Sequence, residues 1–130
     1  MPHPQMFAPD DPLLARIRGI ALALPEADEK VSHGRPAFFT QKVFCYFGGS
    51  ERRADGWVAH DAAIMVRPDA DDDPALRQDP RFWVPMYLGP SGWLGIDLDD
   101  DTDWQEIAEL IDASYRMTAP RRLVKELGGA

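Results

Sequence analysis

The apolar residues of this chain recur first with a helical period and then in short aromatic runs. The first group is spaced by four, three and four residues, which is typical of one helical face: Leu13, Ile17, Ile20 and Leu24. Asp11 precedes the group as a candidate N-cap, Pro12 takes the first helical position, and Pro25 stops the pattern. We therefore predict a helix over residues 12–24.

Five runs rich in aromatic and β-branched residues predict strands at residues 35–39, 43–47, 57–66, 83–88 and 93–98. The first two runs flank a short polar segment and are predicted to form a β-hairpin, whose second strand ends at Gly48-Gly49. The charged residues 50–56 are predicted to form a loop. Residues 89–92 combine glycine, proline and serine, which predicts the turn of a second hairpin.

Three further helices are predicted in the second half of the chain. Asp73-Pro74 begins a short helix over residues 75–78, and Asp103 begins a long one. The buried face of the long helix is predicted from its apolar spacing: Trp104, Ile107, Ala108, Ile111 and Tyr115. A last helix covers residues 120–127 and ends at Gly128-Gly129.

This order of elements predicts an α+β fold. We expect a two-layer sandwich, with an antiparallel sheet of about five strands in two hairpins and with helices packed on one side. A chain of 130 residues fits one domain. The expected organisation is a flexible N-terminal tail over residues 1–9 and a single domain over residues 10–130.

Composition narrows the class of protein further. Hydrophobic residues make up 45% of the chain, enough for a core, and the single cysteine, Cys45, excludes an internal disulfide. The sequence shows no signal peptide and no apolar run long enough to span a membrane. These features predict a cytoplasmic protein that is a monomer or a weak dimer.

The net charge of −8 is concentrated in one part of the chain. Residues 69–112 contain 13 acids and only two arginines, whereas the rest of the chain carries a net +3. An acidic protein is a poor non-specific ligand for polyanions, because phosphate contacts require clustered cations. A basic face outside residues 69–112 is still compatible with this distribution.

Several chemistries are excluded by missing residues. The aspartate runs 69–73 and 99–103 start like calcium-binding loops, but Pro74 and Trp104 occupy the position where such loops need glycine. The three histidines are too far apart for zinc-ligand spacing, and the chain lacks a glycine-rich phosphate loop. Cys45 lies in an apolar strand and is predicted to be inert core. We therefore predict no metal, no cofactor and no enzymatic activity.

Two groups of residues are candidates for binding. His33 and Arg35 flank Gly34 and could grip an anion, or His33 could instead satisfy local backbone groups. The second group is a basic cluster in residues 116–126 with a net +3: Arg116, Arg121, Arg122 and Lys125. These cations could contact phosphate oxygens, or they could neutralise the acidic helix that precedes them.

Six short motifs in the right order resemble the YjbR/MmcQ-like family and together cover residues 13–127. They are Leu24-Pro25, His33-Gly34-Arg35-Pro36-Ala37-Phe38, Lys42-Val43-Phe44, Ser91-Gly92-Trp93 with Gly95, Asp103-Trp104, and Ser114-Tyr115-Arg116 with Ala119-Pro120-Arg121-Arg122-Leu123. The resemblance implies an antiparallel α+β fold similar to frataxin-like and secretion-chaperone-like folds. It also implies DNA binding without an established enzymatic activity. Any contact role would pass to Arg35, Trp93, Arg116, Arg121 and Arg122.

The sequence thus predicts a non-enzymatic domain that binds DNA weakly and in a salt-dependent manner. The alternative is a binding module for a protein partner or a small anionic ligand, which would use the first hairpin and the C-terminal helices. One positive face that joins Arg35, Arg116 and Arg121 would favour nucleic acid. An exposed apolar patch would favour a protein partner.

Overall fold

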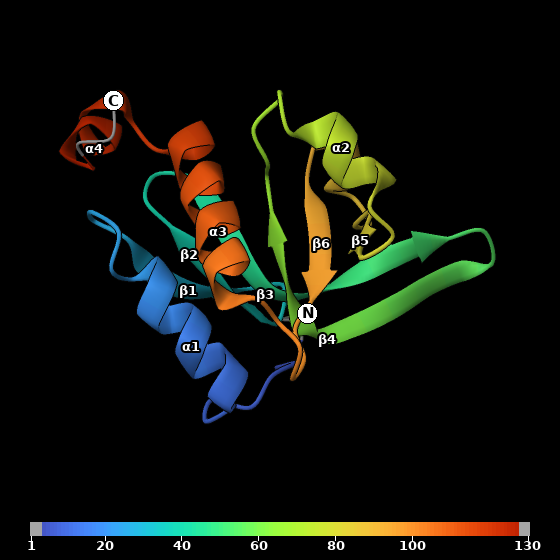
Figure 1. The fold of residues 1–130 in the computed structure, drawn as a ribbon. Coiled ribbons are helices and arrows are strands. Elements are labelled where there is room, and N and C mark those ends of the chain that lie inside the picture. Colours follow the sequence, from blue (N-terminus) through green and yellow to red (C-terminus); the bar gives the residue numbers. More distant parts are fainter. Residues whose placement is uncertain (1–3, 128–130) are drawn as a thin grey trace.

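Six strands form one antiparallel sheet in the computed structural model, which describes residues 4–127 (Figure 1). The strands are β1 (Asp28–Ser32), β2 (Arg35–Phe39), β3 (Val43–Arg53), β4 (Gly56–Val66), β5 (Phe82–Trp83) and β6 (Leu94–Asp97). The helices are α1 (Pro12–Ala21), α2 (Asp73–Gln78), α3 (Trp104–Thr118) and α4 (Arg121–Glu126), with a 3₁₀ turn, η1, over Gly89–Ser91. The strand order is β1-β2-β3-β4-β6-β5, and the predicted α+β class is confirmed.

The four α-helices contribute to a core on one face of the sheet, as predicted. Ile17 of α1 and Ile111 and Tyr115 of α3 are fully buried against aromatic residues of β2 and β3, including Phe38 and Phe44. The predicted N-caps of α1 and α3 are confirmed, because the Asp11 and Asp103 carboxylates accept hydrogen bonds from first-turn amides. None of the helices between residues 4 and 127 has the length and apolar composition of a membrane span.

The first helix ends earlier than predicted. α1 stops at Ala21, three residues before Leu24. Leu22 N makes the last helical hydrogen bond, to Arg18 O, and Leu24 N then donates to Ala21 O in a tighter turn. Residues 1–3 of the predicted tail and Gly128-Gly129 lie outside the described residues. In the rest of that tail, Met6 N donates to Gly34 O at 2.8 Å.

Three strand predictions were wrong. β1 was missed because its polar sequence lacks the expected apolar alternation, yet it pairs with β2 along its length. The charged segment 50–56, predicted as a loop, instead continues β3 to Arg53 and begins β4 at Gly56. The predicted strand 83–88 is reduced to β5, and the Gly89–Ser91 turn is the 3₁₀ turn η1 rather than a simple hairpin turn.

A smaller core lies on the face of the sheet that the α-helices leave uncovered. It contains Ala63, Met65, Trp83 and Trp93. The Trp83 ring lies against Gly95 and close to Gly49, where a Cβ atom would collide with the indole. Gly48-Gly49 therefore does not end β3. It sits at an irregularity in the β3–β4 register and leaves room for larger side chains.

The chain that follows β5 crosses this second face and returns to β3. Glu51 forms a bridge with Pro85, Arg52 N donates to Val84 O at 3.3 Å, and Met86 N donates to Ser50 O at 2.8 Å. We call the projecting part of β3 and β4 (residues 50–61) with the adjoining residues 84–87 the arm. Figure 1 shows its two strands extending well beyond the helices.

We predict that Gly95→Ala destabilises the protein by about 1–3 kcal/mol, because the added methyl group would overlap the Trp83 indole. Urea unfolding of both proteins measures the difference. The control is Gly19→Ala in α1, where nothing lies within 4 Å of the added Cβ. Alanine at that helical position should stabilise by about 0.5–1 kcal/mol. Equal effects at the two glycines would refute the packing described for Trp83.

Candidate functional site

The seven predicted binding residues do not converge on one surface. Arg35 and Trp93 belong to the sheet face opposite the α-helices, and His33 lies in the turn between β1 and β2. The other four lie on α3 and α4 or at their ends: Arg116, Arg121, Arg122 and Lys125. Arg35 therefore does not join Arg116 and Arg121 in one positive face, the arrangement that would have favoured nucleic acid.

His33 and Gly34 shape the hairpin turn that connects β1 to β2. Their φ angles are 54° and 84°, and the flanking residues Ser32 and Arg35 are paired across the hairpin. Two successive residues with positive φ are the pattern of a type I′ turn, which fits the twist of antiparallel strands. The exposed His33 ring lies with Nδ1 3.1 Å from Ser32 Oγ. The motif thus has a clear structural role in directing β2.

Arg35 is buried, with only 7% of its surface exposed. Its Nη2 donates to the exposed carboxylate of Asp61 at 3.1 Å, and its guanidinium packs over Gly48 in space that a Cβ would fill. Nη1 is buried and has no hydrogen-bond partner among the described residues. Arg35 therefore offers little surface for contact with a phosphate.

Trp93 is also part of the core and leaves little surface for stacking on a base. It is 7% exposed and contacts Tyr46 edge-on, with 5.6 Å between ring centroids. The tryptophan with an accessible face is Trp57 in the arm, which is 60% exposed. The sequence pattern did not reveal this difference, because both tryptophans begin predicted strands, 57–66 and 93–98.

Half of the C-terminal cations are paired with carboxylates. Arg116 donates to Asp112 at 3.0 Å, one helical turn earlier. Arg122 donates to both carboxylate oxygens of Glu26, at 2.7 and 3.1 Å, and these hydrogen bonds lower the pKa of Glu26. Arg121 and Lys125 are exposed and have no carboxylate partner in the described part of the chain.

Other residues of the family-like motifs hold elements together. The Ser114 hydroxyl donates to Phe44 O and accepts a hydrogen bond from Arg67 N, which ties α3 to β3 and to the end of β4. Tyr115 packs edge-on against Phe44 and donates to Pro25 O at 2.7 Å. These motif residues are buried structural contacts rather than surface groups.

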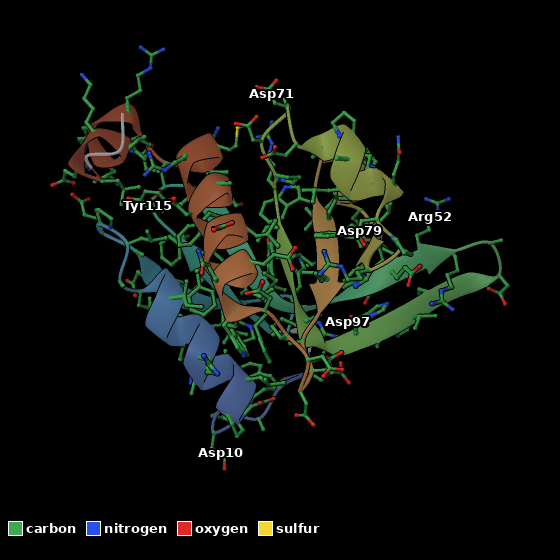
Figure 2. The ribbon with its side chains drawn as sticks, viewed as in Figure 1. Asp10, Arg52, Asp71, Asp79, Asp97 and Tyr115 are labelled. Carbon is green, nitrogen blue, oxygen red and sulfur yellow. The ribbon has the colours of Figure 1, made fainter. Side chains whose placement is uncertain are left out.

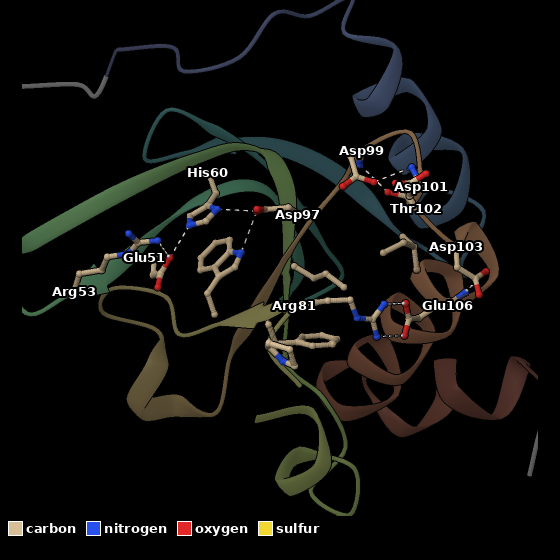
Figure 3. Close-up of a pocket in the computed structure, with 15 residues that line it drawn as sticks. Glu51, Arg53, His60, Arg81, Asp97, Asp99, Asp101, Thr102, Asp103 and Glu106 are labelled. Carbon is tan, nitrogen blue, oxygen red and sulfur yellow. Dashed lines mark hydrogen bonds and ion pairs between the residues drawn. The ribbon is translucent and has the colours of Figure 1, made fainter. Parts of the chain in front are cut away.

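A groove of about 490 Å³ opens where β6 leads into the segment before α3 (Figure 3). Carboxylates dominate its polar lining: Glu51, Asp97, Asp99, Asp101, Asp103 and Glu106. Two arginines also line it, and both are neutralised by carboxylates. Arg53 contacts Glu51, and Arg81 contacts Glu106 and Asp79. The groove is therefore acidic and suits a cationic group better than an anion.

His60 links four strands at one end of this groove. Its Nδ1 lies 2.7 Å from Asp97 Oδ1 on β6, and its Nε2 lies 2.8 Å from Glu51 Oε1 on β3. Its ring stacks on Trp83 of β5, with 4.1 Å between centroids, and Trp83 Nε1 donates to the same Asp97 oxygen. Both ring nitrogens therefore lie within hydrogen-bond distance of a carboxylate oxygen, and the imidazole bridges Glu51 and Asp97.

Sequence reasoning did not identify His60 as a site residue. Its partners lie 9 and 37 positions away, so no local spacing reveals them. The signal lies instead in the register of the sheet, which brings β4 between β3 and β6. Long-range pairing of this kind is available only after the strands have been placed.

Two of the acidic residues near the groove form hydrogen bonds within the protein that do not involve a metal ion. Asp99 Oδ1 accepts from Asp101 N at 2.8 Å, and Asp103 caps α3. Within residues 4–127, no group of three or more histidine, cysteine or carboxylate side chains is arranged to hold a metal ion. Cys45 is fully buried, and burial raises the pKa of its thiol well above the usual range.

We predict that Glu51→Gln lowers stability by about 1–2 kcal/mol at pH 7, because charged hydrogen bonds from Arg53 and His60 would be lost. Hydrogen bonds from Arg53 and then from His60 lower the pKa of Glu51. The Glu51 carboxylate therefore stabilises the folded protein at neutral pH. This stabilisation is lost as pH falls below about 4.5, the ordinary pKa of a glutamate.

Thermal unfolding between pH 7 and pH 3 tests this pH dependence. The difference between wild type and Glu51→Gln should shrink at the acidic end, whereas Asp10→Asn, at an exposed position outside the groove, should change stability little at any pH. A constant difference across the range would show that the Glu51 carboxylate charge is not what stabilises the arm.

Comparison with known proteins gives a family and a fold. Residues 22–117 match the YjbR family. A crystal structure of a Pseudomonas syringae protein has 14% identity and a TM-score of 0.60, covering 80% of this chain and 97% of that one. A Deinococcus radiodurans protein with a DUF419 domain has 18% identity and a TM-score of 0.60, covering 88% and 87%. At these identities the structures support the fold alone. No curated protein matches the chain.

Proposed function

The chain belongs to the YjbR family, and we propose that it is a binding domain for a protein partner rather than an enzyme. The observation that carries the proposal is the arm, where three large apolar side chains are exposed: Trp57, Val84 and Tyr87. Exposed apolar groups that gather on one element are typical of protein contact surfaces, and tryptophan and tyrosine contribute strongly to such contacts.

Two of these side chains lie in one row across the arm. Trp57 is paired with Arg52 in the β3–β4 register, and Arg52 N donates to Val84 O on the neighbouring strand. Partners directly opposite in an antiparallel sheet point to the same face, so Val84, Arg52 and Trp57 present one continuous surface. Figure 2 shows Arg52 projecting from the arm. Arginine beside aromatic residues is also favoured at protein interfaces.

Tyr87, three residues after Val84, is a further exposed aromatic residue of the arm, and its backbone is strained. It is 87% exposed and has a φ angle of 65°, which costs a non-glycine residue about 1–2 kcal/mol. Flanking hydrogen bonds hold this conformation, from Leu88 N to Met86 O and from Gly89 N to Pro85 O. Strain kept at a surface aromatic residue is common at binding sites and supports a contact role for Tyr87.

We predict that Trp57→Ala with Tyr87→Ala, made together, reduces partner binding at least about tenfold, because aromatic contacts at interface centres contribute 2 kcal/mol or more. Immobilised protein is incubated with nuclease-treated extract, and bound proteins are quantified by mass spectrometry. Nuclease removes nucleic acid that could bridge two proteins. The variant should remain folded, since both side chains are exposed.

The matched control replaces two exposed apolar residues outside the arm, Leu22→Ala and Val31→Ala. It should retain the same proteins as wild type. If the arm variant and wild type capture the same proteins in the same amounts, the arm is not the binding surface.

Nucleic-acid binding is a second candidate, and it is favoured by Arg121 and Lys125 of α4. These two residues are four positions apart on one helical face, exposed and without carboxylate partners among residues 4–127. The remaining cations of the cluster already neutralise Asp112 and Glu26. Two available charges on a protein of net charge −8 support only weak, salt-dependent contact with DNA.

We predict that any duplex binding has a log K against log salt slope of roughly −2, since each phosphate contact contributes about 0.9. Fluorescence anisotropy with a labelled duplex at increasing salt gives the slope. Arg121→Ala with Lys125→Ala should abolish binding on every sequence, whereas Arg122→Ala should change it less, because Arg122 is paired with Glu26. Binding that survives the first double substitution would exclude α4 as the contact surface.

A small anionic ligand is the least supported of the three candidate partners. Its one favourable feature is the buried, unpartnered Nη1 of Arg35. The neighbouring Nη2 is already bonded to Asp61, whose negative charge opposes an anion at the same guanidinium. The groove described above does not include Arg35 and is lined mainly by carboxylates.

A further inference from the structure

One side of β4 is left unpaired along half of its length. β4 has eleven residues, but β6 pairs only with Ala63–Val66, and the last contact beyond that pairing runs from Leu98 N to Ala62 O. Residues 56–60 pair with β3 on one side, and Asp61 follows at the irregularity in that register. On the other side they have no strand neighbour in the described part of the chain.

Other edges of the sheet are protected in ways that this edge is not. β1 carries Asp28, Glu29 and Lys30, and β5 is only two residues long. The outer side of β3 within the arm is covered by residues 84–86. The β4 edge reads Gly-Trp-Val-Ala-His-Asp; its one acidic residue, Asp61, is paired with Arg35, and it has no lysine or proline. An uncovered edge without these residues is a template for an added strand.

The acidic groove lies at the inner end of this edge. After β6, the chain makes its last hydrogen bond to β4 at Leu98 and then turns through residues 99–103 toward α3. A strand added beside residues 56–61 would continue the line of β6, so one of its ends would meet the loop that carries Asp99 and Asp101. Asp97 and His60 lie at the same junction and also line the groove (Figure 3).

The two faces beside the edge differ in character. Trp57 and Ala59 are exposed on one face, whereas Val58 and His60 alternate with them toward the groove. A strand added here would meet apolar surface on one side and carboxylates on the other. Alternating apolar and basic side chains would match both faces.

We propose that the β4 edge binds an extended, basic segment of a protein partner by strand addition, with basic side chains directed toward Asp97, Asp99 and Asp101. This inference rests on the proposed function and specifies the chemistry of the partner. Backbone hydrogen bonds along residues 56–61 supply affinity, and the carboxylates select for positive charge. A second copy of the chain fits less well, because each copy has a net charge of −8 and brings the same acidic loop to the contact.

The test uses a labelled eight-residue peptide of alternating valine and lysine. Anisotropy measures its binding, and NMR hydrogen exchange measures protection of the amides in residues 57–61 of the full chain. The peptide should bind and slow exchange at this edge. Two control peptides should bind at least about tenfold more weakly. One replaces lysine by glutamate, and the other carries backbone N-methyl groups that prevent strand pairing.

Matched protein variants separate charge at the edge from overall charge. Asp99→Asn with Asp101→Asn keeps the side-chain acceptor that forms the loop and removes two charges, and it should weaken binding about three- to tenfold. Asp71→Asn with Asp72→Asn makes the same charge change near α2 and should leave binding unchanged.

Three results would overturn the inference. The first is equal binding of the lysine and glutamate peptides. The second is peptide binding without protection of the amides in residues 57–61. The third is protection of these amides that rises with the concentration of the protein alone, which would indicate that a second copy occupies the edge. A fourth result separates the two proposals: no peptide binding, combined with loss of protein capture by the Trp57 and Tyr87 variant, would refute strand addition and leave the protein-partner function standing.

Discussion

The placement of the Trp83 indole is the constraint on which the second half of this structure depends. The ring lies on Gly95, reaches toward Gly49 and stacks on His60, so one side chain of β5 contacts β6, β3 and β4. Glycine is required beneath the ring because any Cβ would occupy the same space. Glu51 and Asp97 then hold the imidazole from both sides, and Arg53 donates a further hydrogen bond to Glu51.

The features with functional interest follow from this contact. The stacking of Trp83 on His60 fixes the arm against β6. The chain after β5 then crosses the face of the sheet opposite the α-helices and covers one side of the arm through the Glu51–Pro85 bridge. The same arrangement leaves Trp57 and Tyr87 in solvent and residues 56–61 without a second strand. The acidic groove is the space between this junction and the start of α3. Exposed aromatic side chains, an unpaired strand edge and a group of carboxylates are thereby brought together from segments far apart in the sequence.

Local patterns were sufficient for much of the fold but for little of the site. The periodicity of α1 and α3 and the cap residues Asp11 and Asp103 predicted those helices, because burial of one helical face requires that spacing. β1 was missed because an exposed edge strand needs no apolar alternation, and residues 50–53 were missed because both faces of the arm carry polar groups. His60 could not be found, since its partners are set by strand register. Arg35 does not meet the C-terminal cations because its side chain lies on the face of the sheet opposite α3.

The family resemblance is carried mainly by residues that build the fold. His33-Gly34 forms a turn, Arg35 is buried beside Gly48, and Ser114 and Tyr115 fasten α3 to β3 and to the segment before β1. Such residues identify the architecture without specifying a ligand. Function is therefore better sought in the arm, which lies outside most of the matching motifs and presents the exposed aromatic side chains.

Hydrogen exchange in the unmodified protein tests most directly whether the arm is a fixed structural element. The amides of Arg52 and Met86 donate to Val84 O and Ser50 O, and neither bond would exist if residues 50–56 and 84–88 were ordinary loops. We predict that both amides exchange orders of magnitude more slowly than an unstructured peptide, as amides in stable hydrogen-bonded structure do. Exchange of Arg52 and Met86 at unprotected rates, while the amides of Phe44 and Ile64 in the core stay protected, would contradict the structure of the arm and the binding role inferred from it.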